Sequence, residues 1–231
     1  MSIVTAMFAS AADAERAINS LAENGFDSKQ VNYLAAADVS SHFPVHAPHA
    51  GATVGGVLGL GAATFLPGIG AIVAAGMLAS GLIGAALGAA AGAAVRNRHT
   101  HGVPNEDLYF YDEAIRTRQT VVMVDAKDEV EATKARNLLE RAGGRSVQAV
   151  RHEWWQNVRD AHRDDFNGRE IEFRQGFEAA LHPATRGREY EQVTDYVTTC
   201  YGDACRSDAF RVGYGRGQEY FRSKMAARET E

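Results

Sequence analysis

The stretch GATVGGVLGLGAATFLPGIGAIVAAGMLASGLIGAALGAAAGAAV, residues 51–95, decides how the rest of the chain can fold. It carries no charged side chain, and more than half of its residues are glycine or alanine. Small residues recur at every fourth position, and a four-residue step returns to nearly the same face of a helix. Two ladders of this kind predict glycine-zipper helix packing: Gly51, Gly55, Gly59, and then Gly76, Ser80, Gly84, Gly88, Gly92.

The composition of the whole chain limits the class of protein. Its 231 residues suffice for one large or two small domains. The net charge of −5 argues against nucleic acid as a partner. The opening MSIVTAMFAS lacks the features of a secretory signal, so we expect a location in the cytoplasm or at the cytoplasmic face of the inner membrane. Cys200 and Cys205 match no disulfide or metal motif, and we expect reduced thiols.

Two segments that flank the glycine-rich stretch show the same order of elements. Residues 3–8 predict a strand, residues 11–24 a helix and residues 31–36 a second strand. After the stretch, a strand is predicted over residues 120–125, a helix over 129–142 and a strand over 146–151. The two helices align without gaps at an offset of 118, which pairs Ala14 with Ala132 and Gly25 with Gly143. Two βαβ halves predict an α+β fold, a ferredoxin-like sandwich.

The two halves can pair only if both ends of the glycine-rich stretch emerge on the same side. We therefore predict a helical hairpin that turns at Pro67, Gly68 and Gly70. Its second arm would be about 40 Å long, enough to cross a bilayer core of ~30 Å, whereas the first would reach about 24 Å. Three interpretations stay open: a membrane-inserted hairpin, a hairpin buried in a homo-oligomer, and a flexible linker.

We divide the chain into four parts. Residues 1–50 hold the first half and a loop rich in His and Pro, and residues 51–95 the hairpin. Residues 96–151 hold a linking helix and the second half, and residues 152–231 an all-α C-terminal region. In this region FRQGF at 173–177 is echoed by FRVGY at 210–214, an offset of 37. We expect amphipathic helices over 165–181 and 207–227, and a short helix near 190–199.

Charged and imidazole side chains gather at the two ends of the hairpin. Five histidines would come within reach of one another there, as a metal site, a pH sensor or a solvated loop: His42, His46, His49, His99 and His101. Arg96 and Arg98 would anchor the hairpin at a membrane interface. No catalytic motif is present, so we expect neither enzyme activity nor a cofactor.

Residues 1–151 resemble a group of bacterial heat-induced general stress proteins, in which a glycine-zipper hairpin splits a ferredoxin-like domain. The matching segments are IVTAMFASAADAERAINSLAENGF, GATVGGVLGLGAATFLPGIGAIVAAG, VPNEDLYFYDEAIRTRQTVVMVDA and ATKARNLLERAGG. The tail resembles aromatic-Gly helical segments appended to bacterial stress-associated proteins. The resemblance implies a role in stress response and supplies no catalytic residues.

These observations lead to two hypotheses. The first is a non-enzymatic stress-response protein that associates with the membrane, with copies of itself, or with both, through the glycine-zipper hairpin. Its partners would then be a second copy of the chain and membrane lipid. The alternative is a soluble oligomeric regulator that binds a small ligand or senses metal or pH.

Overall fold

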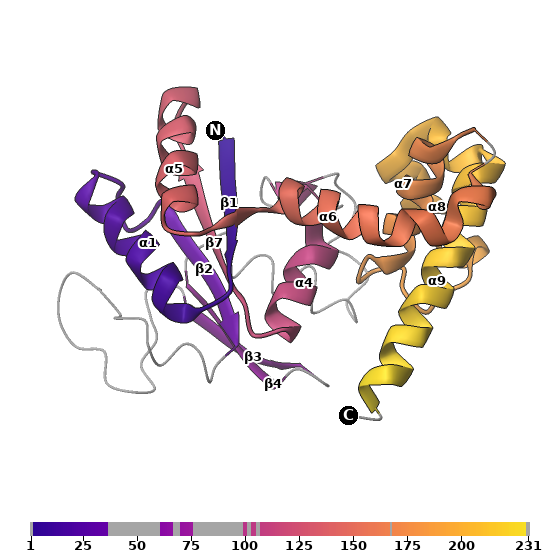
Figure 1. Ribbon diagram of the computed structural model, residues 1–231, viewed down its shortest axis with the longest axis horizontal. Helices are drawn as coiled ribbons and strands as arrows, with labels where there is room; N and C mark the ends of the chain where they lie inside the picture. Colours follow the sequence, from indigo (N-terminus) through magenta and orange to yellow (C-terminus); the bar gives the residue numbers. More distant parts are fainter. Residues whose placement is uncertain are drawn as a thin grey trace. The chain divides into compact units, whose positions relative to one another are not determined.

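The computed structural model describes residues 2–36, 61–66, 70–75, 99–100, 103–104, 107–166 and 168–229. Within these residues the protein is of the mixed α+β class, with seven α-helices and an antiparallel sheet (Figure 1). The chain forms two compact units. The first comprises residues 1–87, 101–103 and 110–151, and the second comprises residues 88–100, 104–109 and 152–231.

Four neighbouring strands of the sheet in the first unit come from the two predicted halves. They are β1 Ser2–Phe8, β2 Val31–Ala36, β7 Thr120–Ala126 and β8 Arg145–Ser146, in the order β8-β1-β7-β2. β1 and β7 pair along their whole length, from Ser2 opposite Ala126 to Phe8 opposite Thr120. β2 pairs with the other edge of β7, and β8 pairs with Ala6 and Met7 of β1. All of these pairings are antiparallel.

The internal repeat is preserved residue for residue in the strand and helix of each half. α1 Ala11–Glu23 and α5 Glu129–Arg141 have the same length, and both their ends are 118 residues apart. The same offset relates the ends of β1 and β7. Asp128 caps α5 as Ser10 caps α1, by accepting a hydrogen bond from the backbone N–H three residues later. Gly25 and Gly143 follow the two helices, each with a φ of +88°.

These two helices pack on one face of the sheet. Their buried residues are equivalent and at most 1% exposed: Ala14, Ala17 and Leu21 in α1, and Ala132, Ala135 and Leu139 in α5. Alanine at two of the three positions lets each helix lie close to the strands. Val4, Phe8, Val122 and Val124 fill the layer beneath them. Both halves therefore contribute equivalent helix positions to the core of the first unit.

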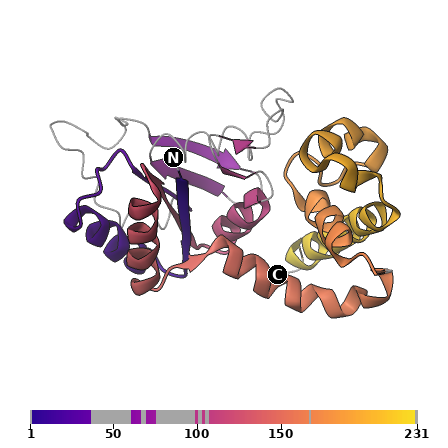
Figure 2. The ribbon, with the colours of Figure 1, turned by 90° about the horizontal axis from the view of Figure 1, so that it is seen from above.

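The opposite face of the sheet is met by the predicted linking helix, which is α4 Leu108–Arg116. Figure 2 shows α4 on one side of β1 and the pair α1 and α5 on the other. The Tyr111 hydroxyl donates a hydrogen bond of 3.4 Å to Thr5 Oγ1 of β1. The linking helix is thus confirmed, although it is shorter than the span 105–118 over which the sequence predicts it.

The predicted strand over residues 146–151 is wrong. Only the two residues of β8 are extended, and α6 Val147–Arg159 follows directly. Val147, Trp155 and Val158 are the buried positions of this helix, at spacings of eight and three. That spacing has the 3.6-residue period of a helix and not the two-residue period of a strand. His152 to Trp155 therefore lie within this helix.

The described part of the glycine-rich stretch is a β-hairpin, so the prediction of helix is wrong there. β3 Gly61–Leu66 and β4 Gly70–Ala75 pair with each other, and β4 pairs with β2. The sheet thereby gains two strands, with the full order β3-β4-β2-β7-β1-β8. Thr64, Phe65, Ile72 and Val73 favour a strand, and glycine on either side of them weakens a helix.

The second unit contains the same supersecondary unit twice. α6, η3 Asp160–Asp165 and α7 Glu170–Leu181 make the first copy. α8 Tyr190–Tyr201, η4 Gly202–Arg206 and α9 Asp208–Glu229 make the second. α7, α8 and α9 confirm the three predicted helices, with shifted ends. The FRQGF and FRVGY repeats lie at equivalent places in α7 and α9.

Glycines bring α7 and α9 into direct backbone contact. A methyl group on Gly176 would lie 2.0 Å from the carbonyl oxygen of Phe210, and one on Gly213 would lie 2.0 Å from that of Phe173. Further along, a methyl group on Gly217 would lie 2.6 Å from the carbonyl oxygen of Phe177. From the contact of Gly213 with Phe173 to that of Gly217 with Phe177, both helices advance by four residues, so they run in the same direction where they cross.

We predict that Gly176→Ala and Gly213→Ala each lower the free energy of unfolding by about 1–3 kcal/mol, because the added methyl group would overlap a carbonyl oxygen. Gly215→Ala is the matched control. It lies in the same helix, but no described atom lies within 4 Å of the added methyl group. The control should raise stability by up to about 1 kcal/mol through helix propensity. Urea unfolding at low protein concentration measures all three, and equal midpoints would contradict the proposed packing.

Candidate functional site

The residues predicted to pack helix against helix lie outside the described residues, as do Pro67 and Gly68 of the predicted turn. The ladder comprises Gly51, Gly55, Gly59, Gly76, Ser80, Gly84, Gly88 and Gly92. Gly70, the third predicted turn residue, is the first residue of β4. The glycine zipper stays a prediction.

The predicted histidine cluster and arginine anchors are also largely outside the described residues: His42, His46, His49, His101, Arg96 and Arg98. His99 begins β5 His99–Thr100, which pairs with β6 Val103–Pro104. Across the described part of the chain, no three His, Cys, Asp or Glu side chains are grouped to hold a metal ion. Of the helices in these same residues, none is both long enough and apolar enough to span a bilayer.

β3 forms one edge of the described sheet and is a candidate surface for association. Its residues, GAATFL, include no charged side chain and no proline. Among the described residues, β3 pairs only with β4 and is the last strand on its side of the sheet. Natural sheets usually protect such edges with lysine, proline or bulges. An unprotected edge in a charge-free segment is suited to pairing with another strand.

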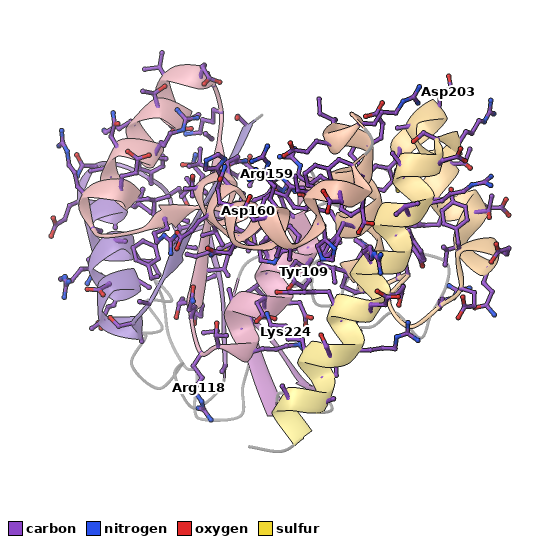
Figure 3. The ribbon with its side chains drawn as sticks, turned by 45° about the vertical axis from the view of Figure 1, so that its right-hand side comes forward. Tyr109, Arg118, Arg159, Asp160, Asp203 and Lys224 are labelled. Carbon is purple, nitrogen blue, oxygen red and sulfur yellow. The ribbon has the colours of Figure 1, made fainter. Side chains whose placement is uncertain are left out.

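Charged hydrogen bonds fasten α6 to α7 in the second unit. Glu170 accepts from Arg159 Nε at 2.7 Å, from Arg159 Nη2 at 3.0 Å and from Trp155 Nε1 at 2.9 Å. These hydrogen bonds, from Arg159 first and Trp155 second, lower the pKa of Glu170. Figure 3 labels Arg159 and Asp160, where α6 ends and η3 begins. Glu170, Arg159 and Trp155 thus hold α6 and α7 in position relative to each other.

A second bidentate pair fastens α9 to η3. Arg216 donates from Nε to Asp165 Oδ2 at 2.9 Å and from Nη2 to Oδ1 at 3.3 Å. The hydrogen bond from Arg216 lowers the pKa of Asp165. Aromatic rings also pack between these helices. The centroid of the Trp154 ring lies 5.8 Å from that of Phe177 and 6.3 Å from that of Tyr220. α9 is thereby held to both helices of the first copy.

His182 is a buried histidine at the end of α7. Its side chain is 3% exposed, and its Nδ1 accepts the backbone N–H of Ala184 at 3.0 Å. The Tyr196 hydroxyl lies 3.1 Å from Nε2. Burial, and then the charge of Arg186, lower the pKa of His182 to about 3. The imidazole is therefore neutral in the folded protein, and it closes the helix end.

We predict that His182 makes the protein less stable in mild acid. The unfolded imidazole, with a pKa near 6.5, binds a proton that the folded protein excludes down to about pH 3, so stability falls as pH falls between these values. His182→Gln should make the slope of unfolding free energy against pH shallower, by up to about 1.4 kcal/mol per pH unit. Tyr196→Phe keeps the imidazole and should keep the slope. Equal slopes in wild type and His182→Gln would contradict the prediction.

A cleft of about 360 Å³ lies between α8 and α9. Tyr190 of α8 and Arg211, Gly215, Gln218 and Arg222 of α9 contribute to its lining. The Arg211 guanidinium lies over the Tyr190 ring, 5.6 Å from its centroid. The cleft carries charges of both signs, since glutamates also line it.

Sequence reasoning missed this cleft. The available signal was GYGRG at residues 213–217, where Gly213 and Gly217 form a small-residue step and the middle glycine, Gly215, does not belong to it.

Comparisons of the chain with protein-family models, with curated proteins and with solved structures give no match.

Proposed function

We propose that the first unit is a ferredoxin-like domain split by the glycine-rich stretch. The strand order β8-β1-β7-β2, with every pairing antiparallel, supports this assignment. The offset of 118 between the halves and the packing of α1 and α5 on one face support it too. On this reading the stretch is an insertion between the two repeats.

We further propose that the protein is a non-enzymatic stress-response protein that assembles with copies of itself. The observation that carries this proposal is the edge strand β3, which comes from the charge-free stretch and has no charge or proline to block pairing. Pairing of β3 with β3 of a second copy would join two sheets by backbone hydrogen bonds. The resemblance of residues 1–151 to heat-induced stress proteins supports the stress role.

The rest of the charge-free stretch is the second element of the proposed mechanism. Its ladders of glycine and serine suit close packing with the same segment of another copy or in lipid. We therefore propose membrane binding as a second activity of this stretch, beside self-assembly. The cleft between α8 and α9 favours a second candidate function, ligand binding, which a screen of small anions and zwitterions by thermal shift would test.

We predict that Thr64→Lys, in the middle of β3, shifts the protein toward smaller species in sedimentation velocity. A charged side chain on an edge strand opposes pairing with a second strand. Thr64→Val, a change of similar size with high strand propensity, is the matched control and should keep the wild-type size. Far-UV circular dichroism should show an intact fold in both. Equal sizes of the two variants would show that β3 is not an interface.

We predict that Gly84→Leu and Gly88→Leu weaken assembly, because leucine holds two backbones apart. Chemical crosslinking should show fewer oligomers for both variants, and an unchanged pattern would remove this ladder from the mechanism. Flotation on liposomes after a carbonate wash distinguishes membrane binding from self-assembly. Protein that floats has its stretch in lipid, and protein that stays soluble with a large, discrete mass has it in an oligomer.

A further inference from the structure

Gly215 lies in the middle of α9, and no described neighbour packs closely enough against it to require a glycine. Glycine weakens a helix, and the neighbouring Gly213 and Gly217 are explained by the α7 carbonyl groups that lie against them. Gly215 faces open space instead, and it forms part of the lining of the cleft. A glycine at such a place allows another backbone to approach α9 closely.

The charges on this face of α9 are arranged symmetrically about Gly215. Arg211 lies four residues before Gly215, and Glu219 lies four residues after it. Asp208 lies seven residues before Gly215, and Arg222 lies seven residues after it. These steps return to the same helix face, and all four residues are exposed. Each pair therefore consists of opposite charges equidistant from one glycine.

This arrangement is complementary to itself. In an antiparallel pair of α9 helices with a twofold axis at Gly215, Arg211 of one copy is level with Glu219 of the other. Asp208 is in the same way level with Arg222, and the exposed Val212 is level with Gln218. A twofold axis repeats each contact, as an isologous dimer requires. The crossing of α7 with α9 shows that glycines on α9 already permit backbone contact.

We propose that the protein forms an isologous dimer through this face of α9, with Gly215 at the twofold axis and a second copy of the chain as the partner. The proposal does not rest on the glycine-rich stretch, which lies in another part of the chain. A single pair of helices is smaller than the standard interface of about 1,600 Å², so the dimer is in equilibrium with the monomer.

Within one chain, Arg211 lies over Tyr190, and Glu219 accepts a hydrogen bond from Arg216 at 3.1 Å. Arg211 and Glu219 are two helical turns apart, so they do not pair with each other inside one chain.

Charge reversal tests the pairing by sedimentation equilibrium of the full chain. Arg211→Glu alone and Glu219→Arg alone should each weaken the dimer roughly tenfold, since both symmetry-related pairs become repulsive. An equimolar mixture of the two variants should restore it, because every pair is then attractive. Arg206→Glu, at an exposed arginine before α9, is the control and should behave as wild type. Failure of the mixture to recover would overturn the proposal.

A crosslink at the axis gives an independent readout that assembly through β3 would not produce. Gly215→Cys should form a disulfide-linked dimer under mild oxidation, because a close crossing brings the two Cα atoms within the 7 Å that a disulfide requires. Val130→Cys, an 81% exposed position on α5, is the control and should crosslink far less. Equal crosslinking of the two would overturn the proposal. If Thr64→Lys leaves the size of the assemblies unchanged and this crosslink still forms, the proposed assembly through β3 fails while the α9 dimer stands; if the crosslink is lost and Thr64→Lys still reduces the assemblies, the reverse holds.

Discussion

The first unit depends on the pairing of β1 with β7. These strands come from the two ends of the unit and align over seven residues, from Ser2 with Ala126 to Phe8 with Thr120. Every other part of the sheet is attached to this pair, since β8 borders β1 and β2 borders β7. α1 and α5 find a common apolar surface only when the two strands lie side by side. The hydrogen bonds between β1 and β7 thus join the two halves into one sheet, which neither half could form alone.

The second unit also joins two similar halves, but it does so by packing helices against each other. Its two copies meet where Gly176 and Gly213 let α7 and α9 touch backbone to backbone. Bidentate arginine–carboxylate pairs and rings around Trp154 then secure the surrounding helices. Duplication followed by pairing of equivalent surfaces therefore describes both units. The symmetric charges around Gly215 would extend this pattern from within the chain to the proposed contact with another copy.

Sequence patterns predicted the elements that local chemistry specifies. The offset of 118 indicated the two equivalent halves of the first unit, and the FRQGF and FRVGY repeats lie in the two predicted helices α7 and α9, because helix periodicity is a local signal. The strand expected at 146–151 failed because β-branched residues such as Val147 and Val150 favour a strand, whereas their spacing of three fits a helix, and the structure has a helix there. The β-hairpin of β3 and β4 was missed because glycine and alanine ladders suggest helix packing, whereas pairing with β2 is a tertiary contact. The α9 face becomes visible only once the register of that helix is known.

The separation of β1 from β7 has a consequence for the nascent chain. Ribosomes add about 5–20 residues per second, so β1 waits roughly 6–24 s for its partner to be made. The charge-free stretch is synthesised within this interval, before the sheet that receives β4 exists. β3 and β4 are therefore made before β7 can join β2. In the proposed assembly, two copies would be able to pair through this stretch before either sheet is complete.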